Sequence, residues 1–268
     1  TSYTDTYYSD AATGLTSEQY TILKQKMLKS VYENGGFWIG RYEAGIETNR
    51  TSSSTPITEV PLSKVGTVEK PVYPYNYVTC GNAQIAANML TTDDYTSSLL
   101  FGVQWDLVLK HIEVKEVAKG TALATIQSAL RSDSKDWGNY SNATFTINRG
   151  KYAKYGALTA WYNYNNESGL ANCVTYANGK STKLSASSNS NSILLTTGAS
   201  DTCKKMNIYD LAGNVWEWTL EYSNYSYGPC VIRAGSGIDS DSEPPTYRMF
   251  DYTTNKYGLL GFRVSLFK

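Results

Sequence analysis

The segment that most constrains the fold runs from residue 207 to residue 219 and contains the hexapeptide GNVWEW at residues 213–218. Its large residues Val215, Trp216 and Trp218 bracket the polar Asn214 and the acidic Glu217. This pattern predicts a strand of the core. A carboxylate buried in such a strand is unfavourable unless a cation or backbone amides satisfy it. We therefore expect Glu217 to have a dedicated partner.

Helical periodicity is clearest near the N-terminus. Residues 1–14 are polar and tyrosine-rich without a period, and we expect an extended arm there. Thr16 and Gln19 have the spacing of a capping box, and apolar residues then recur at helical spacing up to the glycines that follow residue 34. Residues 82–90 and 104–113 also show a helical period and are predicted to cover the sheet.

The remaining segments favour one domain over residues 1–268. FWIGRYE at residues 37–43 has the aromatic and β-branched character of a strand and should be central to the fold. Residues 120–197 have weak periodicity, apart from a short helical stretch around Leu123–Leu130, and are interpreted as loop insertions or short helices. The patterned segments that could form a sheet lie on both sides of these insertions.

Composition excludes several classes of function. Basic and acidic residues number 24 each, so no positive excess is available for nucleic acid, and no apolar run is long enough to insert in a membrane. The four cysteines include no CxxC pair, which argues against a zinc knuckle, although two disulfides would be possible outside the cell. His111 is the only histidine and is expected at the surface. A single histidine argues against hydrolase triads and against histidine-rich metal sites.

Four motifs in order resemble the formylglycine-generating-enzyme (sulfatase-modifying factor) family. They are FWIGRYE at 37–43, GNVWEW at 213–218, VIRAGS at 231–236, which is similar to the RGGS turn of that family, and GFRVSL at 261–266. The resemblance implies an α+β fold of the C-type-lectin-like kind, here with long loop insertions. It covers the ends of the chain, and the middle third carries little of it.

The resemblance also implies metals. It suggests a calcium ion bound by Glu217 and neighbouring backbone carbonyls, and hard oxygen ligands suit calcium. A structural carboxylate bonded to Arg263 or to backbone amides explains the same residue, so both interpretations stay open. The enzymes of the family oxidise a cysteine with copper held by two cysteines between the RGGS-like turn and the GFRV strand. Residues 237–260 contain no cysteine, so this chain is expected to lack that activity and to be no enzyme.

The interval that lacks the copper cysteines is instead rich in aromatic and charged residues, a composition typical of binding surfaces. We expect it to form a ligand-binding site. Its predicted members are Asp239, Asp241, Tyr247, Arg248, Phe250, Asp251, Tyr252, Asn255 and Tyr257. The alternatives are an ordinary solvated loop, or a site at the tyrosine-rich stretch of residues 222–227.

The same motifs look like the variable proteins of diversity-generating retroelements, whose C-terminal binding residues are diversified. The sequence therefore favours a non-enzymatic binding module, such as a receptor or adhesin at the cell surface of a bacterium or phage. Its ligand would be an unidentified protein or glycan. Two alternatives are a pilus-associated or other structural surface protein and a divergent enzyme, such as a relative of the iron-dependent sulfoxide synthases. The second would need a histidine cluster that one histidine cannot supply.

Overall fold

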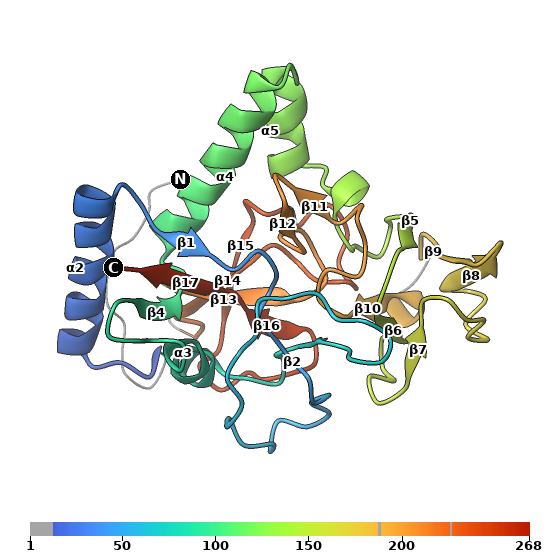
Figure 1. Cartoon of the computed structure of the whole chain (residues 1–268), viewed down its shortest axis with the longest axis horizontal. Coiled ribbons are helices and arrows are strands. Elements are labelled where there is room, and N and C mark those ends of the chain that lie inside the picture. The colour runs from blue at the N-terminus through green and yellow to red at the C-terminus, as the bar shows by residue number, and fades with distance from the viewer. Residues whose placement is uncertain (1–12, 187–188, 226) are drawn as a thin grey trace.

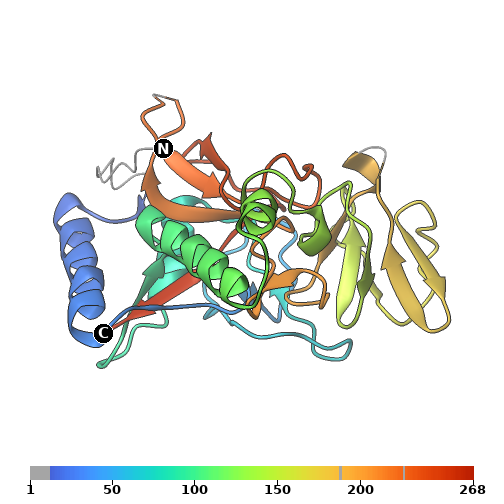
Figure 2. The ribbon, with the colours of Figure 1, turned by 90° about the horizontal axis from the view of Figure 1, so that it is seen from above.

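The computed structural model describes residues 13–186, 189–225 and 227–268 and shows a mixed α+β architecture. The expected arm at residues 1–14 lies almost entirely outside the described residues. The molecule is elongated (Figure 1), with the first long helix at one end and a β-hairpin of residues 174–183 at the other. A view from above shows the same arrangement (Figure 2).

The helices form largely where the periodicity places them. In chain order they are α2 (Ser17–Asn34), α3 (Cys80–Asn88), α4 (Gly102–Ala118) and α5 (Leu123–Arg131), with 3-10 turns η1 (Lys135–Trp137) and η2 (Asn189–Asn191). The capping box of α2 is confirmed, because Thr16 Oγ1 accepts from the Gln19 amide and Gln19 Oε1 accepts from the Thr16 amide. Helix α4 extends past the predicted residues 104–113 at both ends, and His111 is exposed on it, as expected.

The strands are short and belong to six small sheets. In chain order they are β1 (Trp38–Ile39), β2 (Gly45–Ile46), β3 (Tyr73–Pro74), β4 (Thr96–Leu99), β5 (Phe145–Ile147), β6 (Lys151–Lys154), β7 (Trp161–Asn163), β8 (Val174–Ala177), β9 (Lys180–Lys183), β10 (Ile193–Leu195), β11 (Lys204–Lys205), β12 (Ile208–Tyr209), β13 (Trp216–Tyr222), β14 (Cys230–Arg233), β15 (Arg248–Asp251), β16 (Leu260–Phe262) and β17 (Val264–Phe267).

The largest sheet has the order β15-β14-β13-β16, so β15 is one of its edges. Strand β13 pairs antiparallel with β14 and parallel with β16. Only Arg263 separates β16 from β17, and β17 lies between β1 and β4 in a second sheet. Trp216, Trp218 and Phe262 pack in one buried cluster with residues of α2 and α3. The predicted core role of the GNVWEW and GFRV segments is therefore confirmed.

The FWIGRYE segment is a strand only at Trp38–Ile39, where it pairs with β17. The predicted strand over residues 37–43 is therefore too long. The Gly40 amide still donates to the Val264 carbonyl of β17, but the Gly40 carbonyl accepts a hydrogen bond from the Arg263 guanidinium instead of from a neighbouring strand, and the regular ladder ends there. The segment ends at Glu43, whose side chain is fully buried.

Residues 120–197 differ from the loops or short helices expected there. They contain α5 and two three-stranded sheets, with orders β5-β9-β8 and β10-β6-β7. Ile147, Tyr152 and Ile193 from these sheets pack with Trp105 and Ile112 of α4 in a second buried cluster. Strands of three or four residues are too short to show the alternation that identifies a strand in a sequence.

The structure also bears on the cysteines and on membrane-spanning helices. All four cysteines are buried and none is disulfide-bonded, so neither of the two disulfides that their number allows is formed. Among the residues that the structure describes, no helix has both the length and the apolar character needed to cross a bilayer.

Candidate ligand-binding surface

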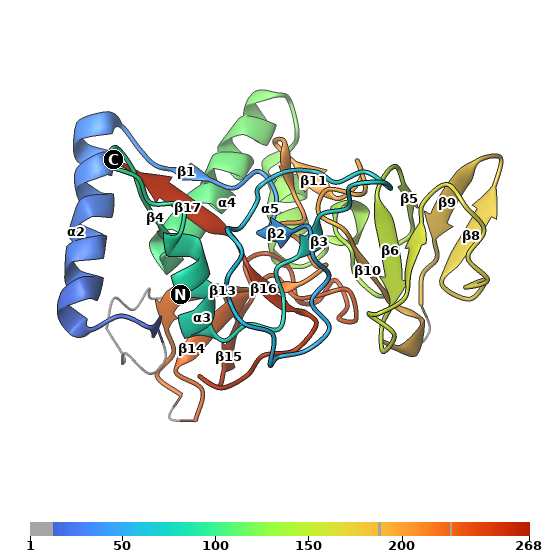
Figure 3. The same cartoon turned by 60° about the horizontal axis from the view of Figure 1, so that its bottom comes forward.

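The predicted binding segment runs beside and along the exposed edge of the largest sheet. β15 pairs with β14 in a register that sets Arg248 against Arg233 and Phe250 against Val231. Because side chains alternate along a strand, Arg248 and Phe250 lie on the same face of the sheet. Turning the molecule brings β14, β15 and the projecting connection between β13 and β14 into view (Figure 3).

The aromatic residues of the segment are the part that faces solvent. Phe250 is 39 % exposed and Tyr252 is 49 % exposed, and Tyr247 and Tyr257 are exposed to a similar extent. Tyr225, from the β13–β14 connection, stacks on Phe250 with ring centroids 4.0 Å apart and an interplanar angle of 22°. The stack joins two segments that the sequence presented as alternative sites. Both contribute to one aromatic surface, defined here as Tyr225, Tyr227 and Phe250, whose rings contact one another, together with Tyr252, two residues after Phe250; the Tyr247 ring lies beside Trp216 instead.

The acidic and amide residues of the prediction have internal partners. Asp239 accepts hydrogen bonds from the Ser236 amide and hydroxyl, and Asp241 accepts from the Asn142 side chain at 2.8 Å. Asp251 is buried and accepts from the Tyr252 amide and from the side chain of Asn255. These four predicted residues (Asp239, Asp241, Asp251 and Asn255) hold the loops of the segment in place. The aromatic side chains are the ones left available for contacts.

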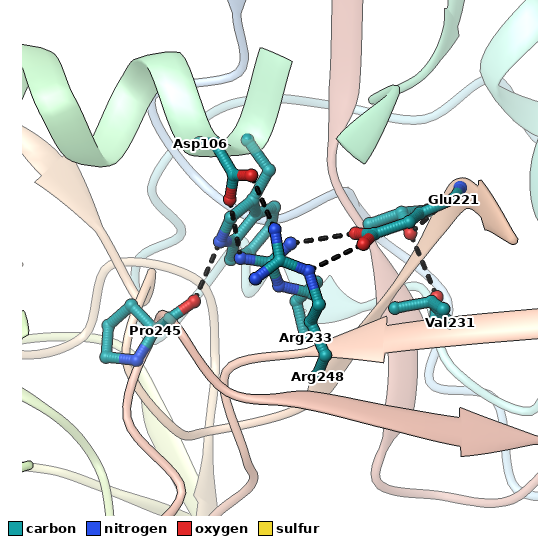
Figure 4. Close-up of polar contacts among 8 residues, drawn as sticks. Asp106, Glu221, Val231, Arg233, Pro245 and Arg248 are labelled. Atoms are coloured by element: carbon teal, nitrogen blue, oxygen red, sulfur yellow. Dashed lines mark hydrogen bonds and ion pairs between the residues drawn. The ribbon is translucent and has the colours of Figure 1, made fainter. Parts of the chain in front are cut away.

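Arg248 belongs to a compact ion-pair network with Asp106, Glu221 and Arg233 (Figure 4). Arg233 donates to Glu221 at 2.9 Å and to Asp106 at 3.0 Å, and Arg248 donates to the other oxygen of each carboxylate. Burial and the neighbouring Arg248 lower the pKa of Arg233, whose guanidinium also lies over the Trp105 ring. Two arginines shared by two carboxylates fix the orientation of β15 against α4.

The other three members of this network are not among the residues predicted for the site. Asp106 comes from α4, Glu221 from β13 and Arg233 from β14, and more than a hundred residues of chain separate Asp106 from the other two. Helix α4 is anchored near the segment by a further bond, since the Trp105 indole donates to the Pro245 carbonyl at 2.8 Å. Only the contact between α4 and the sheet brings these groups together, and no local pattern encodes that contact.

A second buried polar cluster lies where the sequence motifs meet. Arg263 donates to both oxygens of Glu217, at 2.7 and 3.1 Å, and to the carbonyls of Gly40 and Tyr209 at 2.9 Å each. Arg263 and Glu217 are completely buried. This single side chain therefore links the GFRV, GNVWEW and FWIGRYE segments and the strand β12. The dedicated partner expected for Glu217 is Arg263.

Two further carboxyls border this ion pair. Glu43 Oε1 accepts a hydrogen bond from the side-chain amide of Asn214 at 2.5 Å, and Asp210 Oδ2 accepts one from the backbone amide of Gly198 at 2.6 Å. Burial raises the pKa of Asp210 to about 7, and burial together with Asp210 and Glu217 raises the pKa of Glu43 well above its ordinary value. Three carboxyls and one guanidinium share a dry site, so protons replace the missing positive charges.

The donor set around Glu217 does not fit the suggested calcium ion. Calcium takes six to eight oxygen ligands, and both oxygens of this carboxylate already face the Arg263 cation. Within the described part of the chain, no group of three or more His, Cys, Asp or Glu side chains is arranged to hold a metal. The interpretation of Glu217 as a structural carboxylate paired with Arg263 therefore explains its environment.

Comparisons with family models, curated proteins and solved structures gave no match to this chain. The resemblance to the formylglycine-generating-enzyme family and the C-type-lectin-like fold thus remain predictions that depend on the four motifs. The α+β class itself is shown by the structure.

Proposed function

We propose that this chain is a non-enzymatic binding module whose ligand surface is the aromatic surface at the edge of the largest sheet. The ligand is a protein or glycan, and the module acts at the outer surface of a bacterium or phage. The stack of Tyr225 on Phe250 is the observation that carries the proposal. Two rings from separate segments form it, and both remain 39 to 48 % exposed.

Exposed aromatic rings that are already fixed in position favour binding of a partner. Rings held in a fixed position lose little further conformational freedom when a partner covers them, and they contribute large contact area. Clusters of exposed apolar groups on a rigid scaffold are typical of interaction sites. The ion-pair network of Arg233, Arg248, Asp106 and Glu221 supplies the rigid support.

The C-terminal position of the surface suits the diversification suggested by the second resemblance. A site of that kind must accept many side chains without loss of the fold. The aromatic members meet this condition, because their rings are partly in solvent, whereas Arg233, Trp218 and Arg263 are buried. We propose that the exposed positions vary while this buried set is retained.

A display library tests the proposal without knowledge of the natural ligand. Tyr225, Tyr227, Phe250 and Tyr252 are varied to all residues, and folded members are first recovered by resistance to protease. We expect most substitutions at these four positions to survive, and few to survive in a control library at Trp218. The folded members are then sorted on labelled lysozyme, an arbitrary probe protein, and we expect binders that differ from the parent at these positions. If substitutions at the four positions survive protease selection as rarely as substitutions at Trp218, the proposal is contradicted.

A further inference from the structure

We infer that the cavity enclosed by α4, the end of α5 and the start of β15 binds a single carboxylate carried by the ligand. The inference depends on the proposed function, which it deepens, because Arg248 belongs both to the predicted ligand segment and to the wall of this cavity. The cavity has a volume of about 530 Å³, which is within the range of small-molecule sites.

The shape of the cavity follows from helical spacing. On α4, Leu109 and Lys110 lie three or four residues after Asp106, and Glu113 lies three or four residues after them, so these side chains share one helix face. Leu109 and Leu130 are buried and give the cavity an apolar part, while the polar groups surround it. A ligand group with a charged end on an aliphatic stem matches this combination.

The charges that line the cavity favour an anion. Lys110, Arg131 and Arg248 are cationic, whereas Asp106 and Glu113 are the two acids of the lining, so one positive charge is in excess. Hydrogen bonds from Lys110 and Gln127 hold the pKa of Glu113 below its usual value, which keeps this carboxyl ionised at neutral pH. One monoanion neutralises the site, whereas a dianion such as phosphate would leave it negative.

Donors for that anion are present. The Arg131 side chain is 59 % exposed, and its Nη2 lies 3.6 Å from Glu113 Oε2, beyond hydrogen-bond distance. Arg248 uses Nε and Nη2 for Glu221 and Asp106, and its Nη1 has no hydrogen-bond partner among the residues that the structure describes. The exposed Arg131 guanidinium can pair with the two oxygens of a carboxylate in a planar arrangement, while Arg248 can add a single hydrogen bond from Nη1.

The cavity is continuous with the aromatic surface through β15. Arg248 and Phe250 are two residues apart on one face of this edge strand, so a ligand whose carboxylate reaches Arg248 has its next groups beside Phe250 and Tyr225. We infer a ligand that presents an acidic group next to an apolar or planar one.

The test observes the arginine side chains directly. In ¹H–¹⁵N spectra of the whole chain, the Nε–Hε signals of Arg131 and Arg248 are followed as sodium acetate replaces sodium chloride at constant ionic strength. We expect both signals to shift and saturate, while that of Arg149, which is bonded to Asp201 outside the cavity, stays unchanged. The exposed substitution Arg131→Gln should weaken acetate binding about five- to tenfold, because one charge-assisted contact is lost. Phosphate at pH 8, where it is a dianion, should bind more weakly than acetate.

Three outcomes would overturn the inference. They are shifts no larger with acetate than with chloride, an unchanged affinity in Arg131→Gln, and tighter binding of phosphate. If acetate fails while lysozyme binders are still recovered from the aromatic positions, the carboxylate site is rejected and the proposed function stands. If acetate binds but the aromatic positions tolerate no substitution, the carboxylate site stands and the proposed function of the aromatic surface is rejected.

Discussion

Replacement of Arg263 by methionine should be among the most destabilising single changes in this protein. Methionine has a similar length but removes the two bonds to Glu217 and the two bonds to the carbonyls of Gly40 and Tyr209. Removal of one partner of a buried ion pair costs about 3–5 kcal/mol, because the remaining charge is left uncompensated in a dry site. We therefore expect the free energy of unfolding to fall by about 4 kcal/mol at pH 7.

The loss should depend on pH in a definite direction. Arg263 lowers the pKa values of Glu43, Asp210 and Glu217, so without it all three are raised further. A carboxyl with a raised pKa in the folded state adds stability below its unfolded pKa and loses that contribution as pH rises through the folded value. Arg263→Met should therefore be less damaging at pH 5 than at pH 8.

The assay is urea unfolding of four proteins, namely the wild type, Arg263→Met, Glu217→Gln and the double variant. Because the two side chains are bonded to each other, the double variant should be more stable than the sum of the single losses predicts, by about 1–3 kcal/mol. Lys64→Met is the matched control. It breaks the exposed pair with Glu47 and should cost less than about 1 kcal/mol. A loss below about 1 kcal/mol in Arg263→Met, or strict additivity in the double variant, would refute the role assigned to this ion pair.

Three further predictions concern the core, the acidic cluster and the chemistry. Trp218→Ala should lower the free energy of unfolding by about 3–5 kcal/mol in urea, since its ring is buried and its indole donates to a backbone carbonyl, whereas the half-exposed Trp38→Ala should cost far less. Asp210→Asn should remove the share of the decline in stability between about pH 4 and pH 7 that comes from Asp210, on the order of 3 kcal/mol for a pKa near 7, while the share from Glu43 and Glu217 remains. Melting temperatures of both proteins across that range check this. Incubation with copper and a cysteine-containing sulfatase peptide should leave the peptide mass unchanged, and turnover above a no-protein control would contradict the non-enzymatic assignment.

Local signals predicted the elements that local physics determines. The capping box at Thr16 and Gln19 and the paired tryptophans of β13 depend on spacing along the chain, and both are found where the sequence indicates. The sequence left two interpretations of Glu217 open, a calcium ligand or a structural carboxylate bonded to Arg263 or to backbone amides. Arg263 was a candidate because it occurs in the GFRV motif, which also belongs to the core.

The rest depends on contacts between distant segments. Strands of three or four residues in β5 to β10 are stabilised by their neighbours in the fold, so their sequences lack a period of their own. The same holds for the candidate site. Its aromatic members follow from composition, but Tyr225 was placed in an alternative site, and Asp106 and Glu221 carry no signal until α4 packs on the sheet.

The central claim is that the aromatic surface binds a ligand and does not hold the fold together. The most direct test selects ligands for the wild type from a random peptide library and a glycan array, then measures affinity and melting temperature for Phe250→Ala and Tyr252→Ala. Tyr32→Ala is the control, because this tyrosine is 91 % exposed on α2, away from the surface. We expect the two surface variants to lose at least about tenfold in affinity with an unchanged melting temperature, and Tyr32→Ala to change neither. Selected ligands that bind all variants equally, or surface variants that unfold at lower temperature, would contradict the claim.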